Sequence, residues 1–222
     1  MSKKLVFYAV WFLLIFVGLY AVKTNSDLAL VIHSRSALAN FSQRIFGILV
    51  YILMFWQVIL GSNMQWWTEK FGGWVFKFHI YEGVFVYLFM LIHTFSFLLF
   101  NYFLYQKFDP IFVYFDVCLL CKTTADYFYT IGRISFWLLT ITVFAGLFRA
   151  STPFMRANWR KFHTLNYLVF LLTGVHAYFL GTDFFTKPFF YFAIFAYAAV
   201  LYIVIFKKLP ELVRYFLNWL RS

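Results

Sequence analysis

Residues 74–103 read WVFKFHIYEGVFVYLFMLIHTFSFLLFNYF, an apolar run that contains two histidines, His79 and His93. A helix needs about 20 mostly apolar residues to cross the hydrocarbon core of a bilayer. This run exceeds that length, and its only charged residues are Lys77 and Glu82. It therefore predicts a transmembrane helix, and the other apolar runs of the chain are expected to lie in the same lipid bilayer.

The composition of the whole 222-residue chain agrees with a membrane protein. Hydrophobic residues make up 64% of the chain and charged residues 12%, against about 45–50% and about 25% in ordinary soluble domains. Aromatic residues make up 26%, with only 10 Gly and 4 Pro, which excludes the collagenous, low-complexity and disordered classes. The net charge of +11 is dispersed between apolar runs, so nucleic acid is not an expected partner.

Six apolar segments reach the length of a membrane span, and no repeat or linker divides them. We expect residues 1–222 to form one domain, an all-α integral membrane bundle of six transmembrane helices. The first segment follows Met-Ser-Lys-Lys as in a signal peptide, but its length and its lack of a small-x-small cleavage site favour a retained span. The expected spans are about residues 5–22, 44–61, 74–103, 132–148, 162–180 and 188–206.

The basic residues predict the orientation. With the N-terminus inside, eleven of the 19 basic residues fall on inner segments and seven on outer segments, while Lys77 lies within the third span. The positive-inside rule then predicts both termini in the cytoplasm. We expect a multi-pass protein of the cell membrane, of the bacterial inner-membrane type, with a basic amphipathic tail at residues 209–222 on the inner surface.

Four of the five histidines lie in only two of the expected spans. His79 and His93 belong to the third span, and His163 and His176 to the fifth. Ionisable residues inside a bilayer are costly and indicate function by default. The two spans run in the same direction, so His79 shares a depth with His163 and His93 shares a depth with His176. At 1.5 Å per residue, the two levels lie about 20 Å apart.

Two facing imidazoles at each of two levels suit the axial ligation of two stacked haems. A single Zn or Cu site needs its ligands to converge on bonds of about 2 Å, and a metal with only two protein ligands would be underfilled. A porphyrin supplies four equatorial nitrogens, so each helix need give only one histidine. Two alternatives stay open: histidines that pack between helices, and a transporter or proton relay that uses Glu82 and Lys77.

Helical geometry differs between the two histidine spans. The separation of His79 and His93 comes close to four full turns, so these two histidines share one face. The separation of His163 and His176 is one residue shorter, which leaves them about 140° apart on an unbroken helix. This predicts an irregular turn near Thr173-Gly174. Phe170, on the face of His163 and between the two levels, is a candidate aromatic between the haems, with simple core packing as the alternative.

Two stretches resemble the ferric reductase-like transmembrane domain family, which includes NADPH oxidases, ferric reductases and MsrQ haem subunits. They are FHIYEGVFVYLFMLIHT, residues 78–94, and STPFMRANWRKFHTLNYLVFLLTGVHAY, residues 151–178. The spacing of the histidines within each stretch is closest to the oxidase and reductase branch. The resemblance implies an inner b-type haem on one histidine pair and an outer b-type haem on the other, stacked between the third and fifth helices.

The resemblance also implies an activity and partners. It implies an oxidoreductase that transfers electrons across the membrane, from a cytoplasmic donor that uses flavin and NAD(P)H to outer ferric iron or dioxygen. The alternative is an MsrQ-like subunit that passes electrons to a periplasmic methionine sulfoxide reductase. No Gly-rich phosphate loop is visible in the sequence, so FAD and NAD(P)H are expected on a flavin reductase partner or a fused flavin domain.

Further residues are assigned by the same resemblance. Arg44 matches an arginine near the outer haem, where it would contact a propionate or the acceptor. Arg160 and Lys161, beside the inner pair, would neutralise haem propionates or dock a donor, with ordinary membrane anchoring as the alternative. Phe97 stands where oxidases often carry a further histidine, which argues against an oxygen-reducing pocket.

Cys118 and Cys121 form a C-x-x-C motif in the expected outer loop after the third span. Covalent haem attachment requires a histidine next, and Lys122 stands there. A disulfide or a redox relay is open to such a pair outside the cytoplasm, but we expect two free thiols packed as small hydrophobes. His33 is expected to be a surface residue.

Overall fold

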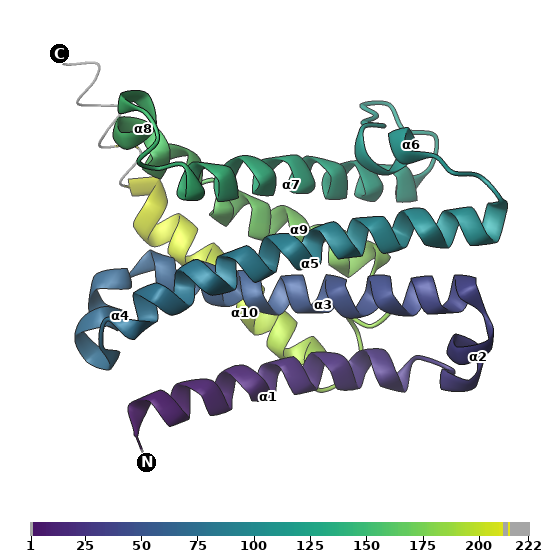
Figure 1. Ribbon diagram of the computed structural model, residues 1–222, viewed down its shortest axis with the longest axis horizontal. Helices are drawn as coiled ribbons and strands as arrows, with labels where there is room; N and C mark the ends of the chain where they lie inside the picture. The colour runs from purple at the N-terminus through teal and green to yellow at the C-terminus, as the bar shows by residue number, and fades with distance from the viewer. Residues whose placement is uncertain (1, 211–212, 214–222) are drawn as a thin grey trace.

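The computed structural model of the chain describes residues 2–210 and 213, and these residues form helices and no strands (Figure 1). Among them, five helices are long and apolar enough to cross a membrane, so the chain is a multi-pass helical membrane protein. These helices are α1 (Lys3–Thr24), α3 (Arg35–Ser62), α5 (Trp74–Tyr105), α7 (Thr124–Leu147) and α10 (Phe189–Ile203), which the π-helical turn η1 (Val204–Lys208) extends.

Five shorter helices connect or accompany the long ones. They are α2 (Leu28–His33), α4 (Met64–Phe71), α6 (Pro110–Tyr114), α8 (Pro153–His163) and α9 (Asn166–Leu180). The expected tail at residues 209–222 lies almost entirely outside the described residues.

The fifth predicted span, residues 162–180, is not one continuous helix. α8 ends at His163, a two-residue turn follows, and α9 then has 15 residues, which is short for a membrane span. The irregular turn predicted near Thr173-Gly174 is therefore wrongly placed, because both residues are helical. Gly174 serves packing instead, since a Cβ there would lie 2.6 Å from the ring of Tyr197. The break after His163 places His163 and His176 on separate helices, so one helical face need not hold both.

The histidines lie on α5, at the end of α8 and on α9. α5 packs along α3, and α9 packs along α7, while α1 and α10 both contact α3. α3 is buried on all sides through seven consecutive residues, from Val50 to Trp56, which identifies it as the central helix of the bundle. The two pairs face each other across the interior.

The ends of the bundle agree with the predicted grouping of segments. The Lys3 ammonium donates to the carbonyl of Lys70 at 3.2 Å, and the Lys207 ammonium donates to the carbonyl of Ser62. These contacts bring the start of α1, the helix α4 and the end of η1 to one end of the molecule. Figure 1 shows α8 at that same end and α2 and α6 at the other. The segments predicted to be cytoplasmic therefore lie together.

Candidate cofactor site

Two cavities lie between the α3–α5 pair and the α7–α9 pair. We call them the inner and outer cavity after the predicted orientation. His79 and His163 line the inner cavity of about 220 Å³, and His93 and His176 line the outer cavity of about 310 Å³. The structure thus brings the four histidines together in two pairs. Met54 and Leu139 line both cavities, so these apolar side chains stand between them.

The inner histidines stand at the separation expected for two ligands of one ion. The centres of the His79 and His163 rings are 6.2 Å apart. Two metal–imidazole bonds of about 2 Å, each extended by the distance from nitrogen to ring centre, would place the ring centres about 6 Å apart. The distance between the ring centres therefore matches that of two histidines that ligate one ion.

Each of the four histidine rings packs against a glycine of the neighbouring helix. Two of the glycines lie on α3 and two lie on α7. Within each helix the two glycines are separated by the same number of residues as His79 and His93, so they share one face. The facing pairs are Gly61 with His79, Gly47 with His93, Gly146 with His163, and Gly132 with His176. The two halves of the site therefore share one plan, in which two glycines of one helix face two histidines, carried by α5 in one half and by α8 and α9 in the other.

The glycines are tighter around the outer cavity than around the inner cavity. A Cβ on Gly132 would lie 2.7 Å from the His176 ring, and one on Gly47 would lie 2.9 Å from the His93 ring. The corresponding distances for Gly61 and Gly146 are 3.5 and 3.4 Å, which are ordinary contacts. A larger residue at either outer position would displace the histidine.

Three of the four histidines bind a backbone carbonyl through Nδ1. Each of these carbonyls lies four residues before the glycine that faces the ring, where the missing Cβ leaves room for a second donor. The bonds join His93 to Gln43 at 2.8 Å, His176 to Phe128 at 2.9 Å, and His163 to Thr142 at 3.1 Å. Because the acceptor is a carbonyl, Nδ1 carries the proton and Nε2 keeps its lone pair. Histidines that bind metals are usually oriented in this way.

His79 is the exception. Its Nδ1 is buried and has no hydrogen-bond partner among the described residues. The equivalent carbonyl would be that of Gln57, but the Gln57 side chain instead donates to the His79 carbonyl at 3.0 Å and to Glu82 at 2.8 Å. Glu82 is 3% exposed and also accepts from the Trp11 indole at 2.6 Å. Lys77 is exposed on the same helix, so Glu82 is held by neutral donors and not by an ion pair with Lys77.

Arg44 lines the outer cavity, but a carboxylate of the same chain already binds it. The Arg44 Nε donates to Asp183 at 2.8 Å, and the same two side chains form a second, shorter contact. Asp183 is 3% exposed and also accepts from the Asn25 amide at 3.0 Å. The positive charge of Arg44 is thus compensated within the protein.

Arg133 is a residue of the outer cavity that the sequence interpretation missed. It is 5% exposed and lines the same cavity as His93 and His176. In the predicted topology, Arg133 counts only as one of the seven basic residues on the outer segments. Its position inside an apolar helix is the signal that could have singled it out.

The remaining candidates lie away from the cavity linings. Arg160 and Lys161 are exposed on α8, and the Arg160 guanidinium lies 5.5 Å from the ring of Trp159. Phe170 is fully buried and stacks on Tyr51 with ring centres 4.9 Å apart. It lines neither cavity, and its contacts are those of core packing.

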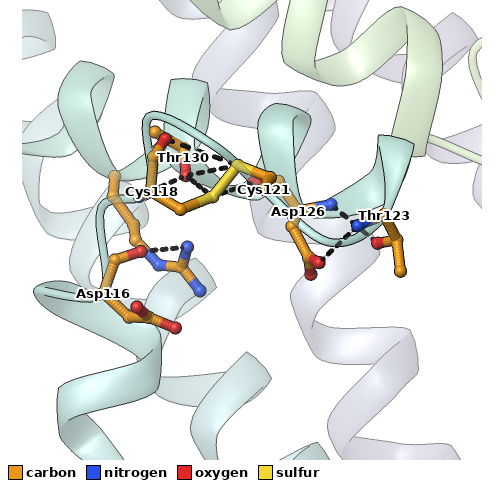
Figure 2. Close-up of a disulfide and its surroundings, with 7 residues drawn as sticks. Asp116, Cys118, Cys121, Thr123, Asp126 and Thr130 are labelled. Carbon is orange, nitrogen blue, oxygen red and sulfur yellow. Dashed lines mark hydrogen bonds between the residues drawn. A yellow bond between two sulfur atoms is a disulfide. The ribbon is translucent and has the colours of Figure 1, made fainter.

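Cys118 and Cys121 form a disulfide (Figure 2), so the expectation of two free thiols is wrong. Their Cα atoms lie 5.3 Å apart in a tight turn, within the range that a disulfide requires. The turn is fixed to α7, because the amide of Cys118 donates to the Thr130 hydroxyl at 3.3 Å. His33 is exposed, as predicted.

Comparison with models of protein families, with curated proteins and with solved structures finds no match to this chain. Within the described residues, no three His, Cys, Asp or Glu side chains gather into a group that holds a metal ion by itself. The fold and the cavities define the class: a multi-pass helical membrane protein whose interior carries two facing pairs of histidines.

Proposed function

We propose that this chain conducts electrons across the membrane through two b-type haems, one on His79 and His163 and the other on His93 and His176. The observation that supports this most strongly is the repeated arrangement of histidine, glycine and backbone carbonyl. It fixes the proton on Nδ1 in three histidines and leaves Nε2 available as an axial ligand. When bound, the haems would supply one-electron redox chemistry at two depths in the membrane.

The side chains of the two cavities have distinct tasks in this proposal. The histidines hold and orient the ligand, and the glycines let each ring approach the neighbouring backbone. Met54 and Leu139 form an apolar partition that excludes water between the two sites. The inner pair, with ring centres 6.2 Å apart, would hold one haem iron, and the outer pair would hold the other. Four helices around internal cofactors are a common arrangement in bundles.

The proposal includes six spans with both termini in the cytoplasm. α9 would be the sixth span, although its 15 residues rise only about 22 Å. The exposed basic residues of α8 lie at the same end of the bundle as the start of α1. Cations at this end suit the docking of a cytoplasmic flavin reductase or a fused flavin domain that carries FAD and NAD(P)H.

The outer acceptor in this proposal is ferric iron or dioxygen. A periplasmic methionine sulfoxide reductase is the alternative acceptor, as for MsrQ-like subunits. Phe97 lines the outer cavity and stacks on Tyr129 with ring centres 5.6 Å apart. This apolar ring offers no proton to bound oxygen, which favours an acceptor other than dioxygen.

The test is the haem content of the purified full chain. We expect two haems per chain and a Soret band that sharpens on reduction with dithionite. His93→Ala or His176→Ala should halve the haem content, whereas His33→Ala, which changes an exposed histidine, should leave it intact. A wild-type protein that contains no haem after expression with haem supplied would contradict the proposal.

A haem-free transporter is the second candidate function. It is favoured by the buried carboxylate of Glu82, which lies among membrane helices with Trp11 and Gln57 as its donors, because such groups mark ion pathways. Solute uptake that is lost in Glu82→Gln but survives His93→Ala and His176→Ala would establish it.

A further inference from the structure

We infer that Arg133 binds a carboxylate of the ligand in the outer cavity, and that Arg44 does not. The source of this carboxylate is either a propionate of the outer haem, which rests on the proposed function, or a soluble carboxylate acceptor. The two arginines line the same cavity, and they differ in what already compensates their charge.

The guanidinium of Arg133 is buried without a carboxylate partner. It is 5% exposed, and no ion pair links it to an acid among the described residues. One of its five donors binds the backbone carbonyl of Asp116, the residue at the left of Figure 2. The rings of Phe112 and Tyr129 lie 4.8 and 6.0 Å from its central carbon. These direct partners are all neutral, and the carboxylates of Asp116 and Asp126 act on the guanidinium only from beyond ion-pair distance. A buried charge without a direct counter-charge is costly.

The ionic side chains that line the outer cavity carry a net charge of one positive unit. Its ionic lining residues are Arg44, Arg133 and Asp183. Arg44 and Asp183 compensate each other through their ion pair. The remaining charge of Arg133 therefore suits a ligand with one negative group in this cavity. A planar guanidinium with free donors binds carboxylates through two parallel hydrogen bonds.

Arg133 is also placed beside the ligand-binding histidine. It directly follows Gly132, whose missing Cβ makes room for the His176 ring. A ligand in this cavity would therefore be held by His176 of α9 and by Arg133 of α7. Arg133 adjoins the glycine that positions the His176 ring, so both groups belong to the same part of the cavity.

The experiment measures the midpoint potentials of both haems in the purified full chain by spectroscopic redox titration. Arg133→Gln should shift the reduction equilibrium of the outer haem about tenfold toward the oxidised form, a fall of about 59 mV for a one-electron couple. The physical reason is the loss of a positive charge beside the added electron. Arg133→Lys keeps the charge and should shift it less. The inner haem, which lies in the other cavity, should not change.

The matched control is the double variant Arg44→Gln with Asp183→Asn, which removes one positive and one negative charge together. It should leave the outer potential close to that of the wild type. Loss of the outer haem alone in Arg133→Gln, with the inner haem retained, would also support the inference. If both haems are lost, Arg133→Lys decides: retention of the outer haem supports the inference and its loss overturns it.

Added citrate separates the two sources of the carboxylate. A haem propionate is the source if Arg133→Gln lowers the haem affinity of the outer site without added anion and if citrate leaves the outer potential of the wild type unchanged. If citrate alters the outer potential of the wild type but not of Arg133→Gln, the ligand is a soluble carboxylate. Unchanged haem content and potentials in both media would overturn the inference while leaving the proposed function intact. A wild type without haem would instead contradict the proposed function.

Discussion

Gly132→Ala should weaken haem binding at the outer cavity and leave the inner cavity unchanged. The added Cβ would lie 2.7 Å from Cε1 and Nδ1 of His176, so the ring must retreat by about 0.7 Å to reach ordinary contact. The bond from Nδ1 of His176 to the Phe128 carbonyl, now 2.9 Å, would then exceed hydrogen-bond length. Loss of such an outer-shell bond typically lowers metal affinity about 10- to 100-fold, which corresponds to about 1.4–2.8 kcal/mol.

Gly146→Ala is the matched control for this substitution. Gly146 lies on the same face of the same helix, close to four turns further along, but its added Cβ would stay 3.4 Å from His163. Both substitutions replace Gly by Ala within α7, which favours the helix by up to about 1 kcal/mol in its interior and by less at Gly146, one residue before the end of the helix. Any difference in haem affinity between them therefore reports the contact with the histidine ring.

The assay is a titration of haem-depleted protein with haem, followed at the Soret band, with thermal unfolding as a readout that does not depend on haem. We expect Gly132→Ala to bind haem at the outer site about 10- to 100-fold more weakly than the wild type, and Gly146→Ala to bind both haems as the wild type does. Equal haem affinities in the two variants would refute the role assigned to the glycine contact.

Three further predictions concern stability. Asp183→Asn should lower the free energy of unfolding by about 3 kcal/mol, because it leaves the charge of Arg44 uncompensated in a largely buried site; Arg44→Gln in the same background should restore part of the loss. Glu82→Ala should cost about 1–3 kcal/mol by stranding two buried donors and should reduce inner but not outer haem content. Cys118→Ser with Cys121→Ser should cost about 2 kcal/mol, the loop-closure entropy of so short a ring, and a reductant should lower the melting temperature of the wild type but not of the double variant.

The pairing of the histidines could be predicted because it depends on few quantities. The count of apolar runs gives the direction of each helix, and the rise per residue is a constant of the α-helix. Together they determine which histidines share a depth. The position of the helix break could not be predicted in the same way. Gly174 looks like a weak point in the helix, but its neighbour is Tyr197 of α10, and the local sequence does not show that the two helices meet at this point.

The four glycines carry a signal in the sequence that the prediction did not use. Within each of two apolar segments, a pair of glycines repeats the spacing of His79 and His93, and this periodicity could have found them. The pairing of Arg44 with Asp183 had no such signal, because the two residues are 139 positions apart. Without that contact, Arg44 was the natural choice for an anion-binding residue and Arg133 was one basic residue among many.

The two cavities differ in ways that bear on the direction of the proposed electron transfer. Hydrogen bonds from Nδ1 to a carbonyl raise the basicity of a ligating imidazole, which favours the oxidised metal. Both outer histidines make this bond, whereas His79 on the inner side does not. Taken alone, this difference would lower the outer potential and oppose outward transfer. The positive charge of Arg133 acts in the opposite sense, so Arg133→Gln should make the proposed outward transfer less favourable.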